Sequence, residues 1–221
     1  MLKRTDYQIP KELIDLALTQ IPSDDFRYTI NKPTGSFFYD LWEIKDEFKG
    51  TAWQSILDSL PEEIGEARII ILEPGRCYQA HADLDDRYHL NLLGDESYLV
   101  DLENTTLHKL FTDGFWYNMN AGVRHTAMNV GYSTRVQLVV RHLLKDNTLK
   151  NPVSVKIVFN GADKDHARFA FDREVSPLIN RFNKEGIMNK FEHTDTFVRF
   201  DIENSFKDVL VRSLSENFKV L

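Results

Sequence analysis

Disulfides and membrane spans are the first features that this sequence lacks. Its 221 residues include one cysteine, Cys77, so no disulfide can form within the chain. The lack of a disulfide framework is typical of a reducing compartment. No run of about 18 apolar residues occurs, which argues against a membrane-spanning helix. Residues 1–6 are not followed by an apolar stretch long enough for a signal peptide. We therefore expect a cytoplasmic protein.

An excess of positive charge is also absent. The formal net charge is −7, whereas proteins that bind nucleic acid usually present a basic surface. We therefore expect neither nucleic acid nor a membrane as a partner. The chain shows no internal repeat and no low-complexity segment. Its balance of 42% hydrophobic and 28% charged residues is that of an ordinary globular protein. The length suits one domain with a smaller appendage, or two small domains.

Short strands dominate the middle of the chain. Amphipathic helices are predicted at 11–20 and 51–60, on either side of an aromatic-rich stretch of mixed strand and loop at 26–44. Pro and Gly then separate closely spaced strand candidates. The candidates are 68–72, 77–83, 87–93, 97–102, 106–111, 115–119, 123–128 and 134–142. Asp113-Gly114 is a hairpin signal. This texture favours an antiparallel barrel or sandwich over a parallel sheet.

The sequence changes character after Leu144. A polar linker at 145–152 is followed by a second alternation of elements. We predict a strand at 153–159, a helical stretch at 164–184 that Pro177 divides, a strand at 197–200 and a helix at 204–218. The expected domains are therefore 1–144, a barrel with N-terminal helices, and 151–221, a small α+β unit.

A pattern of metal-ligand residue types stands out in the barrel region. His81 and Asp83 are two residues apart, a spacing that points both side chains to one face of a strand. His125, on another predicted strand, would complete two imidazoles and one carboxylate. That set suits Fe(II) and leaves coordination positions open for dioxygen and a co-substrate. Arg135 lies ten residues beyond His125, on the last strand of the same barrel. A barrel brings such distant strands side by side.

The segment from 66 to 142 resembles the double-stranded β-helix of 2-oxoglutarate/Fe(II) dioxygenases. Within them it is most similar to the aspartyl/asparaginyl β-hydroxylase group, which includes bacterial proline hydroxylases. The resemblance rests on Glu73-Pro74-Gly75, His81-Ala82-Asp83, Arg87-Tyr88-His89-Leu90-Asn91-Leu92, the strand from Gly114 to Asn118, His125-Thr126-Ala127-Met128-Asn129 and Thr134-Arg135. It implies a mainly β fold with flanking helices, built on a jelly-roll or cupin-like barrel. The small C-terminal α+β unit lies outside the resemblance and is predicted from the sequence pattern alone.

The resemblance also implies roles for single residues. The Fe(II) ligands would be His81, Asp83 and His125, with no catalytic residue beyond them. Arg135 would pair with the distal carboxylate of 2-oxoglutarate through bidentate hydrogen bonds. His89 would help to hold this co-substrate. Arg87 lies on the same strand face as His89 and would contact either the co-substrate or a carboxylate of the prime substrate.

The expected activity is hydroxylation of an Asp, Asn or Pro side chain, free or in a peptide or protein. The enzyme would use Fe(II), 2-oxoglutarate and O2 and release succinate and CO2. The alternative is a non-catalytic cupin-like barrel that binds a metal or a small ligand. The triad favours the oxygenase, because a binding module has no need of an open metal face beside an arginine that reads a carboxylate. A metal-dependent isomerase, or a dioxygenase that does not use 2-oxoglutarate, is a third reading. Residues 151–221 are expected to help select the substrate.

Other polar and aromatic residues have structural interpretations. Asp85-Asp86 is interpreted as a solvated turn, and Cys77 as a small buried residue. Tyr98 is interpreted as a core residue in preference to a co-substrate ligand. The run Phe37-Phe38-Tyr39 is assigned to the core, with a substrate rim as the alternative. The cluster Asp163-Lys164-Asp165-His166 is interpreted as the charged start of a helix.

Overall fold

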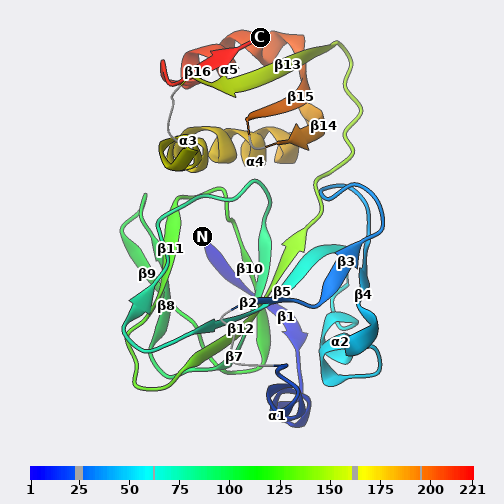
Figure 1. Cartoon of the computed structure of the whole chain (residues 1–221), viewed down its shortest axis with the longest axis vertical. Helices are drawn as coiled ribbons and strands as arrows, with labels where there is room; N and C mark the ends of the chain where they lie inside the picture. The colour runs from blue at the N-terminus through cyan, green and yellow to red at the C-terminus, as the bar shows by residue number, and fades with distance from the viewer. Residues whose placement is uncertain (23–26, 62, 161–163, 195) are drawn as a thin grey trace. The chain divides into compact units, whose positions relative to one another are not determined.

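A computed structural model gives the fold of the chain. It describes residues 1–22, 27–61, 63–160, 164–194 and 196–221. The chain divides into two compact units. The first comprises Met1–Ala80 and Asp85–Leu143, and the second comprises Leu144–Leu221 together with the short segment His81–Leu84. Figure 1 labels the helices and strands of both.

The first unit is built mainly from strands. Its helices are α1 (Lys11–Thr19), α2 (Ala52–Leu57) and a 3-10 turn at Asp46–Phe48. Its strands are β1 (Leu2–Gln8), β2 (Arg27–Thr29), β3 (Asn31–Pro33), β4 (Trp42–Ile44), β5 (Ile64–Leu72), β6 (Arg76–Cys77), β7 (Arg87–Leu93), β8 (Ser97–Asp101), β9 (Thr106–Lys109), β10 (Phe115–Met119), β11 (His125–Asn129) and β12 (Arg135–His142). The strands predicted at 87–93 and 115–119 are confirmed to the residue, whereas β1 was not predicted.

Two antiparallel sheets face each other in this unit (Figure 1). The larger has the order β1-β10-β7-β12-β5-β2 and the smaller has the order β6-β11-β8-β9. From β5 to β12 the chain passes back and forth between the sheets, and only the β8–β9 hairpin stays within one. This path is that of a double-stranded β-helix, so the predicted jelly-roll class is confirmed.

The hairpin predicted at Asp113-Gly114 is wrong, because this pair joins β9 and β10, which belong to different sheets. Gly114 has a φ of +76°, and its carbonyl accepts a hydrogen bond from the backbone of Ile9. A Cβ at Gly114 would lie 2.6 Å from the Ile9 carbonyl oxygen. Glycine is therefore required where the chain changes sheets beside β1.

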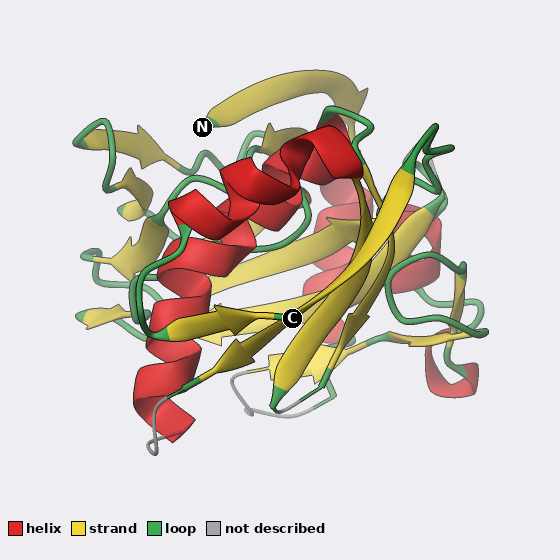
Figure 2. Cartoon of the chain, turned by 90° about the horizontal axis from the view of Figure 1, so that it is seen from above, coloured by secondary structure: helices red, strands yellow, loops and turns green. Residues whose placement is uncertain are grey.

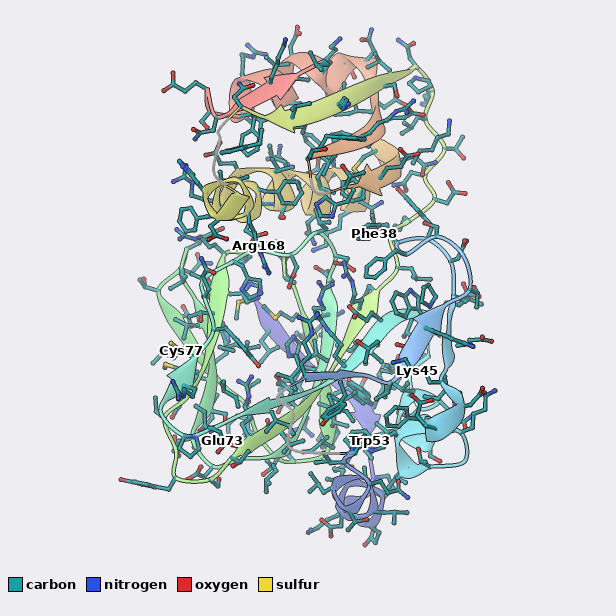
Figure 3. The ribbon with its side chains drawn as sticks, in the orientation of Figure 1. Phe38, Lys45, Trp53, Glu73, Cys77 and Arg168 are labelled. Atoms are coloured by element: carbon teal, nitrogen blue, oxygen red, sulfur yellow. The ribbon has the colours of Figure 1, made fainter. Side chains whose placement is uncertain are left out.

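Alternation along the larger sheet separates an apolar face from a polar one. The apolar face packs against α1 and α2 to form the main core. Its members include Ala67, Ile69, Tyr88, Leu90, Leu92, Val136, Leu138 and Val140. Trp53 of α2 is completely buried there, close to α1 (Figure 3), and its indole N–H donates to the Gln20 carbonyl at 3.2 Å.

The opposite face of the same strands lines the interior of the barrel. The side chains that alternate with the core residues are Glu66, Arg68, Arg87, His89, Asn91, Arg135, Gln137 and Arg141, and all of them are largely or fully buried. Polar groups are costly to bury unless they find partners. A barrel with an apolar coat and a polar, arginine-rich interior is therefore suited to enclosing a polar ligand.

Four residues in the smaller sheet or in the loop after β6 differ from their predicted positions. Strand β6 ends at Cys77, so His81 and Asp83 lie in the loop before β7 and not on a strand. Cys77 is exposed at the outer side of this sheet (Figure 3), which contradicts its assignment as a buried residue. The Tyr98 hydroxyl donates to the Glu96 carboxylate, and its ring is only half-buried, so Tyr98 is not a core residue.

The second unit is a small α+β structure. Its elements are β13 (Pro152–Phe159), α3 (Lys164–Ala170), a π-helical turn (Phe171–Val175), α4 (Ser176–Lys184), β14 (Met188–His193), β15 (Phe197–Glu203), a 3-10 turn (Asn204–Phe206), α5 (Lys207–Ser213) and β16 (Phe218–Val220). The strands form an antiparallel sheet in the order β14-β15-β13-β16. Figure 2 shows these strands in yellow beside the red helices.

The helices of this unit differ in part from the predictions. Pro177 lies in the first turn of α4, where proline is tolerated, and the π-helical turn precedes it. The helix predicted at 204–218 is shorter, because α5 ends at Ser213 and the chain returns to the sheet as β16. Asp163, in the predicted charged helix start, lies outside the described residues. Within the described parts of the chain, no helix is long and apolar enough to cross a membrane.

Asn31 offers a direct test of the packing between β3 and β5. Its side chain is 1% exposed; its amide donates to the Gly65 carbonyl at 2.8 Å and accepts from the Ala67 N–H at 2.7 Å. Asn31→Ala leaves both buried backbone groups without a hydrogen-bond partner. It should therefore lower the free energy of unfolding in urea by about 2–4 kcal/mol. Exposed Lys32→Ala should change it by less than about 0.5 kcal/mol. Equal stability of the two variants would contradict this role of Asn31.

Candidate functional site

Three ligand-type side chains converge in the structure. Ligand atoms of His81, Asp83 and His125 all lie within 4.8 Å of one another, the one such group found in the described residues. The Nε2 of His81 is 3.8 Å from Oδ2 of Asp83. Ligands at about 2.1 Å from one ion and at right angles to one another are about 3.0 Å apart. Small side-chain rotations would therefore bring all three ligand atoms to a single metal ion.

A backbone hydrogen bond fixes the ring of His125 in an orientation and tautomer that suit a metal ligand. It is buried at the start of β11, and its Nδ1 lies 2.7 Å from the Val123 carbonyl oxygen. A carbonyl can only accept a hydrogen bond, so in the neutral ring Nδ1 carries the proton and Nε2 is the nitrogen with a lone pair. A backbone carbonyl on the second nitrogen is a common support for a metal-binding histidine.

The loop that carries His81 and Asp83 is fixed at both ends. At its start the Tyr78 N–H donates to the Ala127 carbonyl at 2.9 Å, and the Thr126 hydroxyl donates to the Tyr78 carbonyl. Both contacts tie the chain to β11, the strand of His125. At the other end Asp85 is held by two arginines. The prediction that His81 and Asp83 lie on one face of a strand is wrong. The hydrogen bonds at the two ends of the loop hold it in place instead.

Asp85 is a buried structural residue, so its interpretation as a solvated turn is wrong. It is 4% exposed. Arg141 makes a bidentate pair with its carboxylate, with N–O distances of 2.7 and 2.8 Å. Arg87 pairs with the same carboxylate and also donates to the Asp85 carbonyl at 2.9 Å. Arg87 therefore holds the end of the loop, and a direct contact between Arg87 and a ligand stays a prediction.

The aromatic run near residue 38 covers Arg141. The guanidinium carbon of Arg141 lies 4.8 Å from the ring centre of Phe37 and 5.2 Å from that of Phe38. Phe37 is 39% exposed, so its assignment to the core is wrong. Stacking on the two rings shields the Asp85–Arg141 pair from water and strengthens it.

Arg135 is almost completely buried, at 1% exposure, where β12 begins. Its Nε and Nη1 have no hydrogen-bond partner among the described residues. The ring of Tyr78 lies 5.8 Å from its guanidinium carbon, and burial lowers the pKa of Arg135. A buried guanidinium without a carboxylate is unfavourable. Arg135 is therefore suited to bind a carboxylate of a ligand through paired hydrogen bonds.

His89 lies on β7 inside the same barrel and stays uncharged. Burial is the main cause that lowers its pKa to about 3, and repulsion from His125, Arg135 and Arg87 adds to it. The side chain of Gln137 lies beside the ring and opposes the shift. A neutral imidazole can donate one hydrogen bond to an anionic ligand without adding charge to the interior.

Comparisons with known proteins gave structural similarities but no sequence match. No protein-family model and no curated protein matches the sequence. Solved structures with a similar fold include the viral collagen prolyl hydroxylase vCPH from Paramecium Bursaria Chlorella virus-1, with 12% identity, 64% of this chain and 90% of that chain covered, and a TM-score of 0.43. A prolyl-4-hydroxylase from Pseudomonas putida shows 17% identity and a TM-score of 0.41, and the match covers 63% of this chain and 90% of that chain. A cupin domain from Bordetella pertussis Tohama I shows 18% identity, coverage of 37% and 84%, and a TM-score of 0.32. At this level of similarity no residue role passes from those proteins to this chain.

The low pKa of His89 predicts acid sensitivity of the metal-free protein. In the unfolded chain the pKa of His89 is about 6.5. Between pH 6.5 and 3 this side chain is therefore protonated in the unfolded state but neutral in the folded state. The contribution of neutral His89 is complete above pH 6.5 and is lost as the pH falls toward 3, by up to about 3 kcal/mol at pH 4. His89→Gln should therefore flatten the decline of the unfolding midpoint between pH 7 and 4. Exposed His166→Gln should leave the decline unchanged. Parallel curves for wild type and His89→Gln would contradict the prediction.

Proposed function

We propose that this protein is an Fe(II)- and 2-oxoglutarate-dependent dioxygenase that hydroxylates an amino-acid side chain, Asp, Asn or Pro, free or in a peptide. The observation that carries the proposal is the combination of a convergent His-Asp-His ligand set with Arg135, a buried arginine that has unsatisfied N–H groups among the described residues. A barrel that only bound a metal would gain nothing from burying that second group.

The ligand set fits Fe(II). Two imidazoles and one carboxylate suit this ion and leave several coordination positions for other ligands. His81, Asp83 and His125 would hold it. His81 and Asp83 are partly exposed while His125 is buried, so the ion can enter from solvent onto a preset imidazole. Bound together, iron and 2-oxoglutarate would supply the oxidative decarboxylation that activates dioxygen for insertion into a C–H bond.

The barrel interior fits 2-oxoglutarate. Arg135 would pair with its distal carboxylate in the bidentate geometry that a guanidinium favours. Neutral His89 would donate to the co-substrate, and Gln137 beside it would orient the imidazole. The side chain of Asn91 is buried on the same strand face as His89, two residues further along β7. These groups contribute positioning and exclusion of water, which make a reactive site productive.

Anaerobic Fe(II) and 2-oxoglutarate should give the weak visible charge-transfer band of an iron–2-oxoglutarate chelate. His81→Ala should abolish the band because one ligand is removed. Arg135→Met should keep the band but require about 10- to 100-fold more 2-oxoglutarate, since a charged hydrogen-bond pair is lost.

The matched control for this experiment is Arg76→Met, which removes an exposed arginine of the smaller sheet. It should behave as wild type. If metal-loaded wild-type protein gives no band, the chain is better described as a non-catalytic, cupin-like binding barrel. If Arg135→Met has a normal requirement for 2-oxoglutarate, the assignment of Arg135 is wrong.

A further inference from the structure

Positive charge is concentrated inside the barrel of an otherwise acidic protein. The arginines on the inward face of the larger sheet are Arg27, Arg68, Arg87, Arg135 and Arg141. Arg87 and Arg141 are directly opposite each other on β7 and β12, an arrangement that is repulsive on its own. Asp85 pairs with both and offsets one of the two charges, and the carboxylate of Glu66 lies 3.8 Å from Arg141. This leaves the charges of Arg68 and Arg135 to be explained.

Arg68 points into the barrel because of its place in β5. Its neighbours Ala67 and Ile69 are completely buried in the apolar core on the other face. Arg68 is opposite Val139 of β12, and Val139 is in turn opposite His89 of β7. The three residues therefore form one row across the sheet. The Arg68 side chain is only 13% exposed.

Arg68 has no complete counter-charge within the described protein. Its nearest carboxylate is Glu66, with 3.6 Å between Nη1 and Oε2, which is longer than a hydrogen bond. Glu66 is also shared, since it lies 3.8 Å from Arg141 and accepts a hydrogen bond from the Thr29 hydroxyl. The Nε of Arg68 has no hydrogen-bond partner among the described residues.

The surroundings of Arg68 favour an anion. Burial and the neighbouring charges of Arg87, Arg27 and Arg141 lower its pKa to about 10, against the weaker opposing effect of Glu66. Arg27 is on the same face of the adjacent strand β2 and is exposed. An approaching anion therefore meets the field of Arg27 first and then the buried guanidinium of Arg68.

Arg68 and Arg135 are separate attachment points. Arg135 is opposite Leu72 on β5, whereas Arg68 is four residues away on that strand. At about 3.3 Å per residue their rows are about 13 Å apart. With Arg135 and His89 matched to 2-oxoglutarate, the guanidinium of Arg68 remains for a second anionic ligand.

We propose that Arg68 binds a carboxylate of the prime substrate, so that the enzyme accepts an amino acid or an acidic peptide that presents this group to the barrel interior. The inference deepens the proposed function and rests on it. It assigns to Arg68 the contact that the sequence alone left open for Arg87, which the structure ties to Asp85.

The first test uses sodium acetate as the probe and needs neither metal nor turnover. In an Arg135→Met background, where the other buried arginine is absent, acetate should raise the unfolding midpoint by about 2–4 °C over equal sodium chloride. Adding Arg68→Met should abolish that difference, while adding Arg76→Met should preserve it. An acetate effect of equal size with and without Arg68 would overturn the proposal.

Folding of the variant is itself informative. Burying a cation that is incompletely paired costs free energy, and Glu66 keeps Arg141 as a second neighbour at 3.8 Å, so Arg68→Met should unfold at or above the wild-type temperature without ligand. A drop of more than about 5 °C would mean that Glu66 and Arg68 act as a structural ion pair, which contradicts the proposal. Arg68→Lys keeps the charge but loses the planar fork and should retain part of the acetate effect.

The second test uses Fe(II)-loaded enzyme with L-proline, L-aspartate and L-asparagine as probes, and it follows succinate formation. For any of these amino acids that stimulates turnover, Arg68→Met should raise the amino-acid concentration that gives half-maximal succinate formation by about 10- to 100-fold. The 2-oxoglutarate dependence of the charge-transfer band should keep its wild-type value. A shift in that dependence would place Arg68 at the co-substrate and overturn the proposal. If wild type gives no band, the proposed function fails, and the acetate experiment still decides the role of Arg68.

Discussion

Neutralisation of buried guanidinium groups is the constraint on which this structure depends. The inward face of the larger sheet carries arginines where water is largely excluded, and a buried charge must be paired. Asp85 satisfies Arg87 and Arg141 together, and the rings of Phe37 and Phe38 cover the second of these. The remaining guanidiniums have incomplete partners among the described residues. Arg87 and Arg141, which pair with Asp85, therefore have a structural role, whereas Arg68 and Arg135 are the arginines proposed to bind ligands.

The same interaction supports the candidate metal centre. Asp85 follows Asp83 by two residues, so the arginines that hold its carboxylate also fix the end of the ligand-bearing loop. The other end of the loop is tied to β11, which carries His125. The proposed iron site and the proposed anion site thus depend on the same structural contacts. A change at Asp85 would reach both, although Asp85 touches neither ligand.

Sequence periodicity predicted the short strands well, because alternation of side chains is a local property. It gave β7 and β10 to the residue, and the ligand types at 81, 83 and 125 selected three residues whose ligand atoms lie within 4.8 Å of one another. It failed where pairing is remote. Arg141, the partner of Asp85, is 56 residues away, so nothing nearby distinguished Asp85 from a solvated turn. Arg68 was not singled out, because it begins an apolar run whose sequence predicts only a buried strand. β1 went unnoticed because its partner β10 lies far along the chain.

We propose that the barrel couples decarboxylation of 2-oxoglutarate to reduction of dioxygen at the His81-Asp83-His125 centre. The most direct measurement is turnover of the Fe(II)-loaded protein with 2-oxoglutarate under ¹⁸O2, with mass spectrometry of the succinate. We predict succinate that carries one ¹⁸O atom, formed in wild type and absent in His81→Ala. Intact 2-oxoglutarate in the iron-loaded wild type, with no labelled succinate, would contradict the claim.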